Sequence, residues 1–169
     1  MRVGSCSWSA YGYDDDRHMQ LLMRNVLPRA LFVFGAIWAS PNTLLGLLIG
    51  LPGLLFGARI RFSDDALTFL RYPWGPGSAL ALGNVIVCTQ SSLDGMCSSY
   101  AERFGLCPPG GARFRLGDHE RAHVYQAMLF GVFFLPLYFL CGGISARNRF
   151  EQSADRYAET GSGWWPWSA

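Results

Sequence analysis

Residues 117–143 read GDHERAHVYQAMLFGVFFLPLYFLCGG. This stretch opens with charged side chains and continues into an apolar block that ends at a Gly-Gly pair. Asp118 is the expected N-cap of a helix that begins here. Residues 122–146 contain no Asp, Glu, Lys or Arg. The helix therefore carries its polar groups at one end and an apolar surface along the rest.

The polar end contains an H-E-x-x-H motif, His119-Glu120-Arg121-Ala122-His123. Residues four apart lie on one face of a helix, so both imidazoles can reach one metal ion with Glu120 beside them. Zinc is the ion that this motif indicates. The alternative is a pair of histidines at the solvated end of a helix.

A zinc hydrolase needs a third protein ligand and an open position for water. Downstream, Glu151 and Asp155 are four residues apart on a helix predicted for residues 148–159. Asp155 could hold a ligating histidine through its second ring nitrogen. The alternative is that this pair belongs to the exposed face of a polar helix.

At these residues the sequence resembles the gluzincin metallopeptidases, whose pattern is H-E-x-x-H followed by E-x-x-x-D. It is more similar to small bacterial membrane proteins that read G-D-H-E-x-x-H-x-x-Q and then F-E-x-x-A-D, here residues 117–126 and 150–155. The resemblance extends over roughly residues 79–169. It implies zinc bound by His119, His123 and Glu151, with Glu120 as general base and Asp155 behind the ligands.

Three further residues are candidates, on position alone, for stabilising an oxyanion: Tyr125, Tyr157 and Arg121. The expected mechanism follows from the chemistry of zinc, which lowers the pKa of its bound water toward about 7. Glu120 would take the water proton and pass it to the leaving amine. The predicted function is thus hydrolysis of a protein or peptide substrate.

Two other functions stay open. One is a metal-binding protein without turnover, or an accessory subunit that binds a membrane-protein partner. The other is a toxin-like hydrolase whose apolar hairpins insert into a target membrane. A formal net charge of +2 gives no indication of nucleic-acid binding.

A second apolar block, residues 30–58, also lacks charged side chains, and charged residues are only 15% of the chain. Two such blocks indicate contact with membrane lipid, and the resemblance suggests the bacterial inner membrane. Ser40-Pro41 divides the block, with Ser40 as the expected N-cap of a new helix. The block is either one kinked span or a re-entrant hairpin. Its glycines recur at intervals of three and four and predict close helix packing: Gly46, Gly50, Gly53 and Gly57.

The predicted fold class is α+β in one domain, residues 1–169. A loose N-terminus (1–17) precedes the apolar helical block (18–57), in which a helix starts near His18. A small antiparallel sheet (58–88) follows, with strands at 59–62, 66–70 and 79–88. Residues 89–112 are expected to form an irregular loop, residues 118–159 the metal-site helices, and residues 160–169 a Trp-rich tail at a membrane interface or over the core.

Five cysteines cannot all pair within one chain. Cys97 and Cys107 could form a disulfide if their loop lies in an oxidising compartment. Free thiols are the alternative.

The metal site and the apolar block of residues 122–146 make conflicting geometric demands. A straight helix over residues 122–143 would be about 33 Å long and would carry Glu151 away from His119. The eight steps from Gly143 to Glu151 reach at most about 28 Å. We therefore expect the helix to end near Leu135, the chain to reverse through Pro136 to Gly143, and the last helix to return antiparallel.

Overall fold

The computed structural model describes residues 27–75, 78–106 and 109–167. The predictions for residues 1–17, for a helix from His18 and for a Cys97–Cys107 disulfide involve residues outside these ranges. Contacts divide the chain into two units, Met1–Phe34 and Gly35–Ala169. Helix α2 (Leu27–Trp38) runs through the boundary between them. The folded body described below is the second unit.

A four-stranded sheet lies at the centre of this unit, with the order β1-β2-β4-β3. The strands are β1 (Arg59–Ser63), β2 (Ala66–Leu70), β3 (Ala79–Leu82) and β4 (Val85–Cys88). β1–β2 and β3–β4 are antiparallel, whereas β2–β4 is parallel. The prediction of a purely antiparallel sheet is therefore wrong. The segment 79–88 turns back at Gly83, where φ is +61°, and β4 inserts beside β2.

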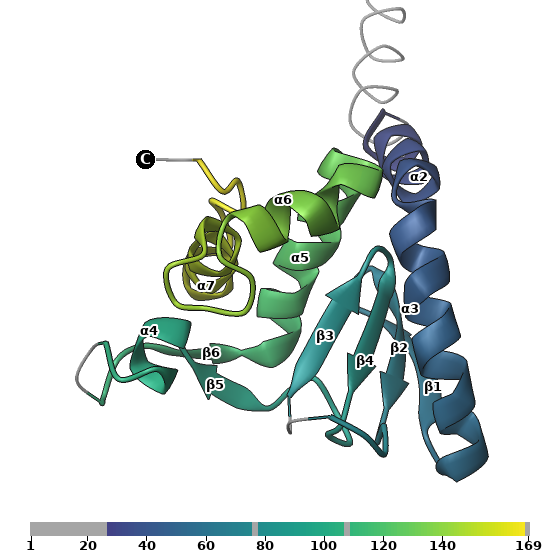
Figure 1. Ribbon diagram of the computed structural model, residues 1–169, viewed down its shortest axis with the longest axis horizontal. Coiled ribbons are helices and arrows are strands. Elements are labelled where there is room, and N and C mark those ends of the chain that lie inside the picture. The colour runs from purple at the N-terminus through teal and green to yellow at the C-terminus, as the bar shows by residue number, and fades with distance from the viewer. Residues whose placement is uncertain (1–26, 76–77, 107–108, 168–169) are drawn as a thin grey trace, which may run out of the picture. The chain divides into compact units, whose positions relative to one another are not determined.

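Helices cover both faces of the sheet (Figure 1). α3 (Ser40–Gly53), continued by the 3₁₀ turn η2 (Leu54–Phe56), packs on one face around Phe69, Val85 and Val87. α5 (Leu116–Phe130) packs on the other face. The N-cap of α3 is Ala39 and not Ser40, and no side chain caps the helix, because α3 continues directly from α2 across a single turn residue.

The glycines of α3 lie against the sheet. A Cβ atom at Gly46, Gly50 or Gly53 would come within 3.0 Å of Val85, Phe69 or Tyr72, respectively. The predicted smooth face is present, but its partner is a sheet and not another helix. Gly57 has a separate role, since its φ of +94° ends η2.

The segment 89–112, predicted to be irregular, contains ordered elements. β5 (Met96–Ser98) pairs with β6 (Arg113–Arg115), and α4 (Tyr100–Arg103) lies between them. Ser99 caps α4 by accepting a hydrogen bond from the Glu102 N–H. Strands of three residues give too weak a sequence pattern to be recognised against the Gly and Pro residues around them.

α5 begins at Leu116 with Arg115 at the N-cap position, so Asp118 lies inside the first turn and not at the cap. The helix ends at Gly131, where φ is +55° and ψ is −133°. A 3₁₀ turn, η3 (Gly131–Phe133), then leads into α6 (Phe134–Leu140), which leaves α5 in a new direction (Figure 1). Pro136 lies in the first turn of α6, where its missing N–H costs no hydrogen bond. The chain therefore turns at Gly131 and not at Pro136.

By length and composition, residues 116–140 form one helical stretch that could cross a membrane, a property shared by core helices of soluble proteins. Among the described residues, a second candidate is found only if residues 28–38 and 40–56 count together as one span despite the bend between them. The face of α5 that carries the H-E-x-x-H motif is buried within the protein.

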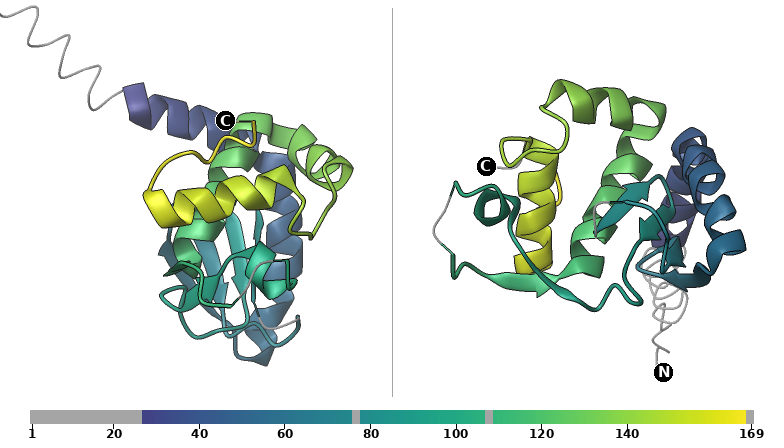
Figure 2. Two further views of the ribbon diagram at one scale, coloured as in Figure 1. Left: turned by 90° about the vertical axis from the view of Figure 1, so that its left-hand side faces the viewer. Right: turned by 60° about the horizontal axis from the view of Figure 1, so that its bottom comes forward.

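α7 (Arg149–Thr160) occupies the predicted position of the last helix. Asn148 caps it and also donates hydrogen bonds to the carbonyl oxygens of Tyr138 and Gly143. Figure 2 shows α7 crossing α5 steeply, so the predicted antiparallel return alongside α5 is wrong. The Trp-rich tail packs on the core, because Trp165 stacks on Phe130 and Trp167 contacts Phe150.

Candidate metal centre

Three ligand atoms from two helices converge at the crossing of α5 and α7. His119 Nε2 and His123 Nε2 lie 3.2 Å apart. Glu151 Oε2 lies 3.2 Å from the first nitrogen and 3.3 Å from the second. All three side chains are buried, and together they could hold a metal ion. The structure thus brings Glu151 to the histidine pair, although 27 positions separate it from His123 in the sequence.

The spacing of these atoms fits a tetrahedral ion. Ligand bonds of about 2.0–2.1 Å place the ligand atoms of such an ion about 3.3–3.4 Å apart. Glu151 Oε2 is buried and forms no hydrogen bond within the described residues. A buried carboxylate oxygen facing two imidazole nitrogens requires a positive charge among the three groups. A metal ion bound by all three satisfies that requirement.

The ring of His119 is held on both faces and at its second nitrogen. Tyr100 of α4 and Phe114 of β6 stack on its two faces, with ring centroids 5.7 and 6.0 Å away. His119 Nδ1 lies 3.0 Å from Asp155 Oδ1. The other oxygen of Asp155 accepts the backbone N–H of Tyr100. Asp155 thus lies where it favours a proton on Nδ1 and leaves Nε2 free for a metal.

The second nitrogen of His123 faces Gln126, one turn further along α5. The Nδ1–Oε1 distance is 2.8 Å. The Gln126 Nε2 donates to the carbonyl oxygens of Phe150 and Trp164 and to the Ser153 hydroxyl. Because these acceptors orient the amide, its Oε1 faces His123 and accepts a hydrogen bond from the Nδ1–H. Nε2 of His123 therefore presents a lone pair to the site.

Tyr138 of α6 orients Glu151, the third candidate ligand. Its hydroxyl donates a hydrogen bond to Glu151 Oε1, the oxygen that does not face the histidines. Burial raises the pKa of Glu151, but the neighbouring His123 and His119 outweigh burial and lower it. Glu151 is therefore ionised, as a metal ligand must be.

The pKa of His119 also indicates that the site favours a positive charge. Burial lowers the pKa of His119, but the Asp155 and Glu151 carboxylates outweigh burial and raise it to about 10. The site therefore attracts positive charge strongly. A proton or a divalent cation can supply that charge.

Glu120 lies beside the ligands without joining them. It lines the same cavity of about 310 Å³ as His119, His123 and Glu151. Burial raises its pKa, against the opposing effect of the two histidines. Within the described part of the chain no side chain donates a hydrogen bond to Glu120. A cation in the site would favour its ionised form.

The three positional candidates for an oxyanion donor lie outside this cavity. Tyr125 donates its hydroxyl to Asp65, and Arg121 pairs with Asp64. Tyr157 packs edge-on against Tyr125. These contacts attach the outer face of α5 to the β1–β2 turn, where Asp64 and Asp65 both have positive φ. None of the three lines the cavity, because the period of α5 directs positions 121 and 125 away from the face of 119 and 123, and Tyr157 lies on α7 beside Tyr125.

Sequence reasoning gave no role to four residues that shape the site, namely Tyr100, Phe114, Gln126 and Tyr138. Gln126 follows the second histidine by three positions, so it could have been inferred from helix geometry. The other three come from separate elements and carry no local signal.

Comparisons with protein-family models, with curated protein sequences and with solved structures find no match to this chain. The interpretation of the site therefore depends on its motifs and geometry.

Proposed function

We propose that this protein is a membrane-associated, zinc-dependent hydrolase that cleaves peptide bonds. The observation that supports it best is the triangle of His119 Nε2, His123 Nε2 and Glu151 Oε2, with edges of 3.2, 3.2 and 3.3 Å. When bound, zinc supplies an acidified water and a Lewis acid for a carbonyl. Two imidazoles and one carboxylate are the ligand set of several zinc peptidases.

The residues around the triangle have distinct tasks. Gln126 and Asp155 fix the orientation of the two imidazoles through their second nitrogens. Glu120 is the general base that accepts a proton from water and transfers it to the leaving amine. Tyr100 also lines the cavity, so its hydroxyl is the donor for a developing oxyanion, whereas the Tyr138 hydroxyl donates to Glu151.

Metal analysis of the purified full chain tests the metal centre. We expect close to one zinc per chain in the wild type after dialysis, and large losses in His123→Ala and Glu151→Ala. Glu159→Gln, an exposed carboxylate of α7, is the matched control and should retain the ion. Elemental analysis would also detect iron, manganese or nickel. Full occupancy in both ligand variants would refute the site.

Glu120→Gln separates an enzyme from a metal-binding protein without turnover. We expect this variant to retain zinc and to lose hydrolysis. The probe is a peptide library prepared from a bacterial membrane proteome, with new chain ends counted by mass spectrometry. New ends that appear with the wild type, and disappear in the variant and in chelator, support hydrolysis. Identical libraries in all samples would leave only metal binding.

A further inference from the structure

Helix α3 buries its glycines and exposes its leucines to the surroundings of the protein. The side that faces the sheet consists of Gly46, Gly50, Gly53 and Asn42, all buried. The outward side is a row of leucines, of which Leu48 is 72% exposed, and Leu55 in η2 extends the row with 86% exposure. A helix at a water-facing surface places its leucines inward and polar groups outward. α3 therefore faces an apolar environment over its length of about 21 Å.

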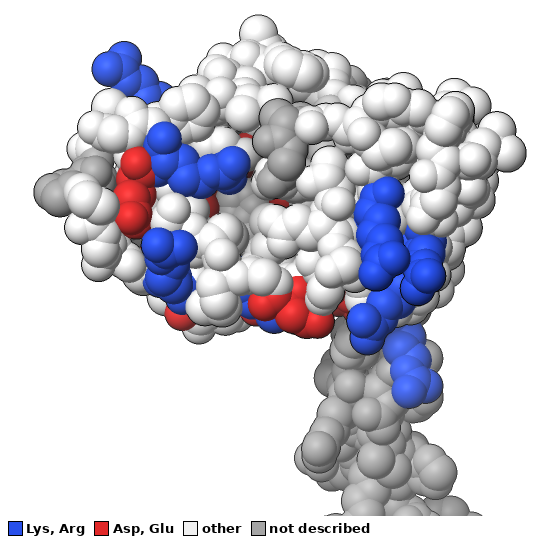
Figure 3. Space-filling view, turned by 90° about the horizontal axis from the view of Figure 1, so that it is seen from below, with Lys and Arg blue, Asp and Glu red and all other residues white. Residues whose placement is uncertain are grey.

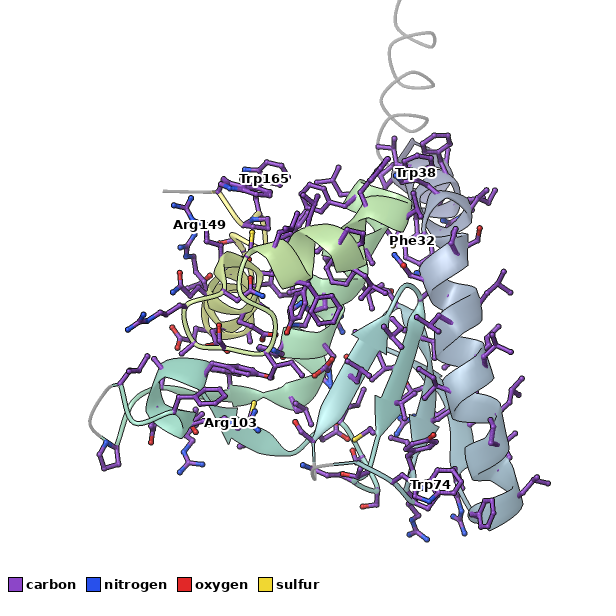
Figure 4. The ribbon with its side chains drawn as sticks, viewed as in Figure 1. Phe32, Trp38, Trp74, Arg103, Arg149 and Trp165 are labelled. Atoms are coloured by element: carbon purple, nitrogen blue, oxygen red, sulfur yellow. The ribbon has the colours of Figure 1, made fainter. Side chains whose placement is uncertain are left out.

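The apolar surface continues over the end of α5 and over α6. Its exposed members are Leu129 of α5, Val132 and Phe133 of η3, Phe139 and Leu140 of α6, and Ile144 in the loop that follows. Residues 124–146 contain no charged side chain. In Figure 4 the side chains along α3 and α6 are almost entirely carbon. Arg, Asp and Glu side chains gather instead on the lower face, which Figure 3 shows.

The cavity over the metal ligands has an apolar rim. The histidine and carboxylate side chains that line it, His119, Glu120, His123 and Glu151, are all buried. The exposed residues of its lining are all apolar: Leu45 of α3, Leu80 of β3, Phe139 of α6 and Ile144. Phe139 is 66% and Ile144 64% exposed. A ligand that reaches the buried side chains must pass these apolar ones.

The residues bordering this surface match a lipid interface. Arg147 and Arg149 are exposed just beyond Ile144, where they can reach anionic headgroups. Trp165 and Trp167 are partly exposed beside Phe130 at the end of α5. Tryptophan prefers the interfacial layer of a membrane. A protein partner would be matched by polar groups within the patch as well as around it.

We propose that the face formed by α3, α6 and residues 141–144 lies in one leaflet of a bilayer, and that the cavity takes an apolar polypeptide segment from the lipid side. The peptide chemistry depends on the proposed function, whereas the lipid contact does not. An apolar side chain is stabilised when it buries its surface against this lining. A charged side chain would lose its hydration there without a partner.

Photo-crosslinking tests the lipid contact without any reference to metal or turnover. The photoreactive residue p-benzoylphenylalanine replaces Leu48, Phe139 or, as the matched control, exposed Arg113 of β6 in the full chain. The protein is reconstituted with vesicles of phosphatidylcholine and phosphatidylglycerol and then irradiated. We expect phospholipid adducts from positions 48 and 139 and few from 113. Absence of adducts at 48 and 139, equal adducts at all three positions, or dimers crosslinked through 48 and 139 would overturn the lipid-facing assignment.

Hydroxamate binding to the zinc-loaded protein tests the preference of the cavity. The probes are N-acetyl-leucine hydroxamate and N-acetyl-aspartate α-hydroxamate, compared by calorimetry. We expect the leucine probe to bind at least tenfold more tightly, and Phe139→Lys to remove most of that difference while zinc content is unchanged. Equal affinities, or tighter binding of the aspartate probe, would overturn the apolar-substrate inference. If neither probe binds, the proposed catalytic zinc site fails, and the crosslinking result stands separately.

Discussion

Gln126 connects His123, α7 and the C-terminal tail through one amide group. Its oxygen faces His123 and its nitrogen bonds to α7 and to the tail at Trp164. In Gln126→Leu we expect zinc affinity to fall by about 10–100-fold, because His123 loses the acceptor that fixes its ring. Competition with a chelating dye measures the affinity. Gln152→Leu, at an exposed position of α7, should leave it within twofold of the wild type.

A comparison of Tyr138 with Tyr125 tests whether the hydrogen bond to Glu151 supports metal binding. Tyr138 donates to Glu151, whereas Tyr125 donates to Asp65 on the far side of α5. We expect Tyr138→Phe to weaken zinc binding by about tenfold or more, since the ligand carboxylate loses its only hydroxyl donor among the described residues. Tyr125→Phe should bind zinc normally. The same competition assay checks both, and equal losses would argue against the role of Tyr138.

Among the elements, the junction of α5 and α6 decides whether the ligands meet. Gly131 has φ +55° and ψ −133°, and a Cβ atom there would collide with the Trp38 indole. We expect Gly131→Ala to lower the free energy of unfolding by about 1–3 kcal/mol or more, because such a backbone conformation excludes side chains. Denaturant unfolding in detergent measures the loss.

Gly105→Ala is the matched control for this change. Gly105 also has positive φ, +69°, but nothing lies within 4 Å of an added Cβ atom. Its replacement should cost less than that of Gly131 and leave zinc affinity unchanged. A Gly131→Ala protein with full stability and full zinc affinity would show that the bend does not depend on glycine.

At the scale of the whole molecule, a metal bound by α5 and α7 adds a strong link to the hydrogen bonds and the packing that already join these helices. Zinc at a free concentration of 100 times its Kd contributes about 2.7 kcal/mol. For a chain of this size that corresponds to a rise in Tm of roughly 5–10 °C. We expect a chelator to lower the Tm of the wild type by this amount, as measured by circular dichroism. His119→Ala should show no response, and a chelator effect that persists in it would place the ion elsewhere.

The local parts of the fold were predictable from neighbouring residues. The β1–β2 hairpin follows from the alternation around Asp64-Asp65, and the α7 helix from its polar composition and the preceding Asn148. The parallel β2–β4 pair was not predictable, because residues 79–88 form a continuous apolar run that hides the turn at Gly83. The β5–β6 sheet was not predicted because each of its strands has only three residues, too few to show a strand pattern.

For the site, sequence spacing determined by itself that His119 and His123 share one face of a helix, because the period of an α-helix is a local property. The E-x-x-x-D motif also identified Glu151 and Asp155 as candidates. Only the tertiary structure decided that Gly131 turns the chain, that α7 crosses α5 with Glu151 at the crossing, and that Tyr138, Tyr100 and Phe114 complete the surroundings. Those relations depend on packing between segments distant in sequence, where no short-range rule operates.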